Sequence, residues 1–291
     1  MRVLITGAGG QLGTDLQRIL LDQLNVKCYA LSRKDLNVTD ASGVRDCMNS
    51  IRPEVVIHAA ANTNVDGCEL DPDSAYRVNT YGTRNMAVAA EKCRAKIVYI
   101  STDYVFDGKG REPFQEDSRT SPINVYGASK LAGEEMVKCF STKFFIVRTS
   151  WLYGWTGKNF VKTILKLAKE QSELTVVDDQ VGSPTFSLDL AQCIIRLMVS
   201  DAYGIYHVTN SGQCSWYEFS TKILEKFCID EVRVTPVKSE EFKRPAPRPA
   251  YSVLGNRALR LNGFSRLPSW QDGMRRFADG YSNDYQMGKP R

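Results

Sequence analysis

The chain has 291 residues, of which 43% are hydrophobic and 24% are charged, and this composition excludes an intrinsically disordered protein. Its formal net charge of +5 comes from 38 basic and 33 acidic residues without a long run of one sign, so we expect no nucleic-acid partner and no membrane partner. The two histidines form no HExxH motif, which excludes a histidine-rich metal site. The eight cysteines form no CxxC pair, which is typical of a cytoplasmic protein with reduced thiols.

The first half of the chain alternates short apolar runs with longer amphipathic runs. The apolar runs predict strands at residues 3–6, 26–31, 54–61, 95–101 and 143–150. The amphipathic runs predict helices at residues 11–24, 71–93 and 124–140. Because strands alternate with helices, we expect an α/β fold with a Rossmann-type doubly wound parallel sheet, which binds its ligands at the carboxyl ends of the strands.

The alternation becomes less regular after Trp151. Helices are predicted near residues 159–170, 187–199 and 215–227, with short strands between them. Pro245, Pro247 and Pro249 require an extended segment without helix or interior strand. We therefore expect one domain over residues 1–151 and a smaller carboxyl-terminal lobe over residues 152–291, with some segments of the lobe returning to the sheet.

Three glycines lie between the first predicted strand and the first predicted helix. Gly7, Gly10 and Gly13 form the pattern GxxGxxG at this point. Bare backbone and a helix N-terminus can both approach a pyrophosphate there, so the pattern predicts a dinucleotide site in the first domain.

The residues after the second strand indicate which dinucleotide binds. An acidic residue at this place would hold an adenosine 2′-hydroxyl, but the chain has Ser32, Arg33 and Lys34 instead. Basic residues here favour a 2′-phosphate and hence NADPH. Acceptance of NADH stays open, because Asp35 or Asp40 could supply the acidic group.

Tyr126 and Lys130 form a YxxxK pair, and residues four apart lie on one face of a helix. The preceding strand ends in Ser101-Thr102-Asp103-Tyr104, so Thr102 is expected nearby. A phenol is a poor proton donor or base at neutral pH until a neighbouring ammonium stabilises its anion. We predict that Lys130 supplies this ammonium and that the Thr102 hydroxyl bonds to a substrate oxygen.

These motifs resemble the extended short-chain dehydrogenase/reductase superfamily. Five ordered blocks are similar to the dTDP-4-dehydrorhamnose reductase family within it, namely STDYVFDG (101–108), PINVYGASKLAGE (122–134), VRTSWLYG (147–154), NFVKTILKLA (159–168) and DDQVGSPT (178–185). The resemblance implies an oxidoreductase of dTDP-rhamnose biosynthesis. Such an enzyme reduces the C4 keto group of dTDP-4-dehydro-6-deoxy-L-mannose with NADPH to give dTDP-L-rhamnose.

The resemblance also implies roles for single residues. Thr102, Tyr126 and Lys130 would be catalytic, with Tyr126 as the donor of a proton to the sugar C4 oxygen. The substrate would contact Thr102, Asp103, Tyr104 and Trp151. The cofactor would contact a larger set, which comprises Gly7, Gly10, Gln11, Leu12, Gly13, Ser32, Arg33, Asn37, Val38, Ala59, Ala60, Ala61, Asn62, Thr63, Ile100, Tyr126 and Lys130.

Several positions allow a structural interpretation beside the functional one. Trp151 is either a core aromatic or a wall of the sugar pocket, and His58 is expected to be a hydrogen-bonded core residue. Arg244 and Arg248 either meet the substrate diphosphate or face water.

The expected partner is a dTDP-linked 4-keto-6-deoxyhexose, and the oligomeric state is left open, with a homodimer as one alternative. Some members of the family are dimers linked by magnesium through acidic residues. Asp15 matches one such acidic position, but Leu188 occupies another, so we predict no structural metal.

Two other functions fit the same fold. The first is a noncatalytic regulatory subunit, since the beta subunit of methionine adenosyltransferase is similar and keeps YxxxK; TSW at 149–151 and GSPT at 182–185 favour the reductase. The second is a nucleotide-sugar epimerase or dehydratase. Dehydratases of this kind have an acidic pair after the catalytic threonine, where this chain has Asp103 and Tyr104.

Overall fold

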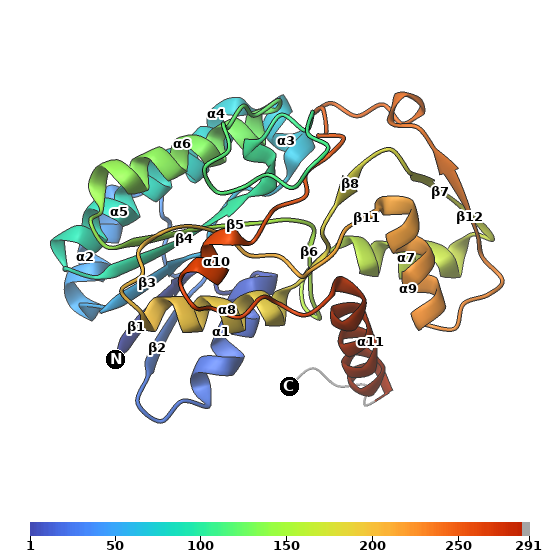
Figure 1. Ribbon diagram of the computed structural model, residues 1–291. Coiled ribbons are helices and arrows are strands. Elements are labelled where there is room, and N and C mark those ends of the chain that lie inside the picture. The colour runs from blue at the N-terminus through green and yellow to red at the C-terminus, as the bar shows by residue number, and fades with distance from the viewer. Residues whose placement is uncertain (287–291) are drawn as a thin grey trace.

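The computed structural model describes residues 1–286, with side chains up to Tyr281, and residues 287–291 of the predicted carboxyl-terminal lobe lie outside this part. Its centre is a six-stranded parallel sheet in the order β10-β5-β4-β3-β1-β2 (Figure 1). The strands are β1 (Arg2–Thr6), β2 (Lys27–Leu31), β3 (Val55–His58), β4 (Lys96–Thr102), β5 (Phe144–Thr149) and β10 (Gly204–His207). The predicted doubly wound α/β sheet is therefore confirmed.

Helices cover both faces of this sheet, because successive side chains of each strand point to opposite sides (Figure 1). Val3 and Ile5 of β1 lie in one buried core and Leu4 lies in the other. The first core is shared with α1 (Gln11–Leu21), α8 (Ser187–Val199) and α10 (Arg257–Leu261). The second core is shared with α2 (Ala41–Ile51), α5 (Thr83–Lys92) and α6 (Val125–Phe140). Since α8 and β10 follow residue 151, part of the carboxyl-terminal half does belong to the sheet.

The strand order changes direction between β1 and β3. The chain passes from β1 to β2 on one side and then returns to β3 on the other side of β1. Ligands of doubly wound sheets bind beside such a reversal, at the carboxyl ends of the two strands. Gly7 follows β1 and Ala59 follows β3, so both lie at this point.

The helix predicted over residues 71–93 is divided in the structure. It consists of α4 (Pro72–Tyr76), a π-helical turn η1 (Arg77–Gly82) and α5, and a short helix α3 (Val65–Leu70) precedes it. π-Helical turns are rare and often lie at functional sites. This turn carries Asn79, whose side chain is fully buried.

Most of the remaining chain forms a further core beside the sheet, which we call the lobe core. Three helices contribute to it, α7 (Phe160–Glu170), α9 (Trp216–Lys226) and α11 (Trp270–Gln286). Three two-stranded sheets accompany them, in which β6 (Leu152–Tyr153) pairs with β9 (Thr185–Phe186), β7 (Glu173–Val177) with β12 (Arg233–Val237), and β8 (Val181–Gly182) with β11 (Cys214–Ser215). No helix among the described residues is long and apolar enough to cross a membrane.

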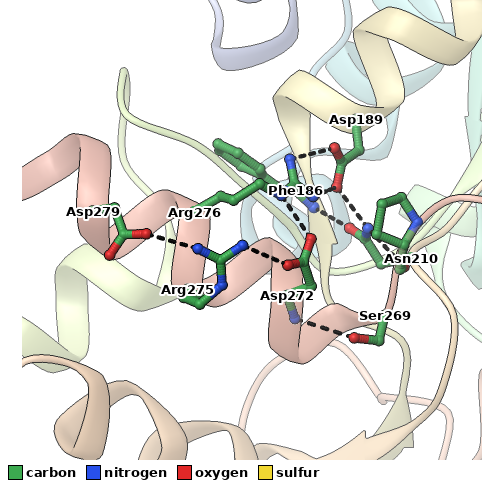
Figure 2. A network of polar contacts seen from close by, with 9 residues as sticks. Phe186, Asp189, Asn210, Ser269, Asp272, Arg275, Arg276 and Asp279 are labelled. Atoms are coloured by element: carbon green, nitrogen blue, oxygen red, sulfur yellow. Dashed lines mark hydrogen bonds and ion pairs between the residues drawn. The ribbon is translucent and has the colours of Figure 1, made fainter.

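A network of polar contacts holds α11 against the rest of the molecule (Figure 2). Arg276 of α11 donates two hydrogen bonds to Asp189 of α8, at 2.7 and 2.6 Å, and a third to Asp272 at 2.7 Å. Asn210 donates to Asp189 and accepts from the amide of Phe186. Because the Asp189 side chain is only 3% exposed and all its partners are donors, the network fixes the last helix to α8 and β9.

The proline-rich residues run as an extended segment, as predicted. We call residues 243–252 the strap. Its backbone bonds to Val181 of β8 through Ala250 and Ser252, at 2.8 Å each, and to Gly108 through Tyr251 at 3.1 Å. Because Gly108 follows β4 and Val181 lies in β8 of the carboxyl-terminal half, the strap joins the two halves of the molecule.

Candidate active site

The glycine turn after β1 is too tightly packed for side chains. Gly7 has a positive φ of 70°, and a Cβ atom there would lie 2.7 Å from the amide nitrogen of Ala60. A Cβ atom on Gly13 would collide with the carbonyl oxygen of Gly7. Helix α1 begins after Gly10, which offers no side chain to cap the first amide groups. The structure therefore presents uncapped helix amides beside bare backbone, and this arrangement fits a dinucleotide pyrophosphate.

The loop after β2 contains the residues predicted to select the cofactor. The amide and the hydroxyl of Ser32 both donate to Asp35, at 2.8 and 2.6 Å, and these bonds lower the pKa of Asp35. Asp40 caps α2 by accepting from the amide of Ser42. Both carboxylates that could replace the expected acidic residue are thus engaged in local turns, while the Arg33 side chain is exposed.

Strand β3 ends at His58 and not at Ala61 as predicted, and the loop 59–63 that follows it is held by a residue that the sequence interpretation missed. Asn79 of η1 accepts from the amide of Asn62 at 2.8 Å and donates to the carbonyl oxygen of Asn62 at 3.1 Å. Its amide also donates to Ser129 Oγ of α6 at 3.0 Å. Asn79 therefore fixes this loop relative to α6, the helix that carries Tyr126 and Lys130.

Thr102, Asp103, Tyr104 and Tyr126 lie together at the carboxyl end of β4. The Thr102 hydroxyl donates to Asp103 Oδ1 at 2.9 Å and accepts from the amide of Tyr104 at 3.2 Å, which begins the 3₁₀ turn η2 (Asp103–Val105). The rings of Tyr104 and Tyr126 meet edge to face, with 5.8 Å between their centroids. The structure thus brings together four residues that the sequence assigned to one site.

Burial controls the titration of the YxxxK pair. It raises the pKa of Tyr126 above the ordinary value of a phenol, although the adjacent Thr102 side chain opposes this shift. It also lowers the pKa of Lys130 to about 7, and Glu134 opposes that shift. The Lys130 Nζ atom lies 4.1 Å from the ring centroid of Tyr99. The expected lowering of the Tyr126 pKa by Lys130 is not found: the contribution that opposes burial comes from Thr102, and the phenol stays protonated at neutral pH.

A buried ion pair lies one helical turn beyond Lys130. Glu134 accepts from Arg148 of β5 at 2.8 and 2.7 Å and from the Ser101 hydroxyl at 2.6 Å. Arg148 Nη1 also donates to His207 Nε2 of β10 at 3.3 Å. Glu134 was quoted in a sequence block without a role, and only its spacing of four from Lys130 could have indicated one.

Trp151 follows β5 with a positive φ of 46°, which is unusual for a residue with a side chain. Its ring stacks on Trp216 of α9, with 3.4 Å between centroids and 5° between planes. A Cβ atom on Gly182 would collide with the same ring. Both tryptophans are partly exposed, so Trp151 is not a fully buried core residue. The sequence interpretation did not identify Trp216.

The strap arginines pair with one carboxylate of the first domain. Arg248 donates to Asp66 at 2.8 Å and Arg244 does so at 3.3 Å. Asn124, the cap of α6, donates to the carbonyl oxygen of Pro247 at 2.9 Å. These contacts hold the strap against α3 and the start of the YxxxK helix.

His58 is a buried core residue, as predicted. Its Nδ1 lies 2.8 Å from the Thr6 hydroxyl and its Nε2 lies 3.1 Å from the Thr83 hydroxyl. Asp15, the acidic position considered for a metal, accepts from the Ser187 hydroxyl, and burial raises its pKa. Among the described residues no group of three or more metal-ligating side chains is found.

Comparisons with known proteins agree with this geometry. A family model described as the RmlD substrate binding domain matches residues 1–283. The spore coat polysaccharide biosynthesis protein SpsK of Bacillus subtilis is 46% identical over 276 residues, which cover 95% of this chain and 96% of that protein. A dTDP-4-dehydrorhamnose reductase of Aggregatibacter actinomycetemcomitans is 40% identical over 286 residues, which cover 94% of this chain and 97% of that protein.

A solved structure of a dTDP-4-dehydrorhamnose reductase is also similar to this chain. The crystal structure of dTDP-4-dehydrorhamnose reductase from Bacillus anthracis in complex with NADP superposes with a TM-score of 0.92 at 49% sequence identity. The alignment covers 96% of this chain and 99% of that chain.

Proposed function

The chain belongs to the RmlD substrate binding domain family, and on that basis we propose that it reduces the C4 keto group of a dTDP-linked 4-keto-6-deoxyhexose with NADPH. The substrate that we propose is dTDP-4-dehydro-6-deoxy-L-mannose, and the product is dTDP-L-rhamnose. The observation that carries this function is the buried phenol of Tyr126 beside the hydroxyl of Thr102, at the carboxyl end of β4.

The residues present fit NADPH. The turn of Gly7, Gly10 and Gly13 would hold the pyrophosphate, because it offers uncapped amides and a surface that no Cβ atom obstructs. Arg33 would bind the 2′-phosphate, since Asp35 and Asp40 are both committed to local hydrogen bonds. The remaining contacts would come from the other residues assigned to the cofactor, namely Gln11, Leu12, Ser32, Asn37, Val38, Ala59, Ala60, Ala61, Asn62, Thr63, Ile100, Tyr126 and Lys130.

Tyr126 would act as the proton donor of the reduction. NADPH supplies a hydride to C4 when it is bound, and the developing alkoxide at the sugar oxygen must then take up one proton. Because burial keeps the Tyr126 phenol protonated at neutral pH, it can donate that proton, and the resulting phenolate recovers one from solvent. Lys130 would stabilise the phenolate, and Thr102 would polarise the carbonyl group.

The sugar would lie between the end of β4 and the lobe core. Asp103, Tyr104 and Trp151 are the side chains that we assign to it. Trp151 supports this role because it stays partly exposed and is held rigidly by Trp216 and Gly182. Residues 1–151 would thus bind the cofactor and carry the catalytic groups, while residues 152–291 would mainly bind the substrate.

The cellular setting follows from the same chemistry. All eight cysteines are free thiols in the structure, and unpaired thiols are typical of the cytoplasm. We therefore propose a cytoplasmic enzyme, and a homodimer stays an alternative to a monomer.

The two rival functions predict different outcomes. A regulatory subunit has no need of the rigid Trp151, yet the chain holds it at the same edge of the sheet as Thr102 and Tyr126. An epimerase would return NADPH unchanged after each turnover. The purified chain should therefore be mixed with NADPH and the dTDP-linked keto sugar while NADPH absorbance is followed. Stoichiometric loss of absorbance supports the reductase, and an unchanged absorbance contradicts it.

A further inference from the structure

The Thr102 hydroxyl lies between the Asp103 carboxyl group and the Tyr126 phenol, which compete for its hydrogen. It donates its single hydrogen to Asp103 Oδ1 at 2.9 Å. A hydroxyl has one hydrogen and can make only one such bond at a time. While this bond exists, Thr102 has no hydrogen to offer to the Tyr126 oxygen or to a substrate carbonyl.

Asp103 is placed unfavourably for a permanent carboxylate. Asp103 is only 2% exposed. Its Oδ2 atom has no hydrogen-bond partner at ordinary distance and angle among the described residues. The donors near this carboxyl group do not fully replace its lost hydration, so burial still penalises the charged form. The neutral acid avoids that cost, so this carboxyl group is suited to take up a proton.

Protonation would reverse the hydrogen bond. The acidic hydrogen on Asp103 would point to Thr102 Oγ1, which is the acceptor within 2.9 Å of Oδ1. Thr102 would then accept from Asp103, and its own hydrogen would be free to turn toward Tyr126 on α6. Because the Thr102 side chain lies beside the Tyr126 phenol, only rotation of this hydroxyl is required.

We propose that Asp103 is a positioning residue, whose protonation turns the Thr102 hydroxyl from the carboxyl group toward Tyr126 and the substrate carbonyl. The inference rests on the proposed reductase function and adds a second group that must be protonated before hydride transfer. Asp103 acts through Thr102 and need not touch the reacting atoms.

The surroundings place this change within an accessible pH range. Burial raises the pKa of Asp103 to about 6, and the hydroxyls of Ser252 in the strap and of Thr102 oppose the shift. The titratable groups that face this carboxyl group are the phenols of Tyr104 in its own turn and Tyr126 in α6. Arg248 of the strap and Asp66 of α3 act on Tyr104 in turn.

The test is the pH profile of single-turnover NADPH oxidation by the full chain. In the wild type the rate should fall roughly tenfold for each unit of pH above the Asp103 pKa. Asp103→Asn should abolish this fall, whatever its maximal rate, because the Asn amide donates to Thr102 at every pH. A separate loss of rate, caused by deprotonation of Lys130 with its pKa of about 7, should remain in this variant. Asp107→Asn, in the same segment, is the matched control and should keep the wild-type profile.

A second pair of variants tests the inference even if Asp103→Asn does not fold. Thr102→Ser keeps the hydroxyl and should keep the fall that begins at the Asp103 pKa, whereas Thr102→Val should leave a slow rate that falls only with deprotonation of Lys130. Persistence of this fall in Thr102→Val, or in a folded Asp103→Asn protein, overturns the inference. Each of these results leaves the reductase function intact, because that function is tested by wild-type NADPH oxidation alone.

Discussion

Glu134 and Arg148 form a bidentate ion pair in which the two side chains are 0% and 2% exposed. Removing one partner of such a pair leaves a buried charge without compensation, which costs about 3–5 kcal/mol. We expect Arg148→Met to lower the free energy of unfolding by about this amount, as measured by urea denaturation. The matched control is Arg257→Met, because Arg257 also pairs with a carboxylate, Asp117, but on the surface. Equal losses in the two variants would contradict the importance of burial.

The phenol of Tyr126 is predicted to be indispensable for catalysis. Tyr126→Phe removes the proton donor without a change in ring size, and we expect kcat to fall by about 10²–10⁴. Thermal unfolding should be nearly unchanged. Tyr203→Phe is the matched control, since it removes a phenol whose hydroxyl bonds to Asp201 before β10, at the opposite edge of the sheet. A Tyr126→Phe enzyme with the activity of Tyr203→Phe would remove Tyr126 from the mechanism.

Arg33 is predicted to select NADPH. A charge-assisted bond to phosphate is typically worth about 1.5–3 kcal/mol, so Arg33→Ala should raise the KM for NADPH by about tenfold or more and leave the KM for NADH nearly unchanged. Lys143→Ala removes the same charge at the amino end of β5 and serves as the control. If Arg33→Ala affects both cofactors equally, the side chain does not contact the 2′-phosphate.

Because His58 and His207 are buried, we expect the protein to lose stability in mild acid. Burial lowers the pKa of His58 and the pKa of His207 to about 3, from an ordinary value of 6.5. A histidine whose pKa is lower in the folded state than in the unfolded state contributes to the free energy of unfolding. This contribution is complete above pH 6.5 and is lost as the pH falls toward 3. Between about pH 7 and pH 5 each histidine should remove about 2 kcal/mol from the free energy of unfolding.

The raised pKa of Asp103 acts in the opposite direction over part of this range, so the comparison must isolate one histidine. His207→Gln should therefore show a difference between the two pH values that is about 2 kcal/mol smaller than in the wild type. Urea denaturation at both pH values measures it. Identical pH dependence in the two proteins would show that His207 is not held neutral in the folded state.

The sequence predicted the parts of the fold and the site that depend on local pattern. The turn of Gly7, Gly10 and Gly13 and the pair of Tyr126 and Lys130 follow from spacing within one strand–helix unit. The break of the 71–93 helix into a π-helical turn was missed, because its residues have ordinary helix propensities.

The contacts that were missed at the site join residues that no local pattern brings together. Asn79 bonds to Asn62, which is 17 residues away, and Arg248 bonds to Asp66, which is 182 residues away. Trp216 contacts Trp151 only because α9 packs against the end of β5. Such contacts depend on how elements distant in sequence are arranged, and a single sequence without related sequences does not specify that arrangement.

The fate of the hydride tests the proposed reaction most directly. The enzyme should be supplied with NADPH that carries deuterium at the transferable position of the nicotinamide, together with the dTDP-linked 4-keto sugar, and the product should be examined by mass spectrometry and NMR. We predict one deuterium at C4 of the product and one NADP⁺ formed per sugar. A product without deuterium, or a sugar that is isomerised while the labelled NADPH stays intact, would contradict reduction at C4.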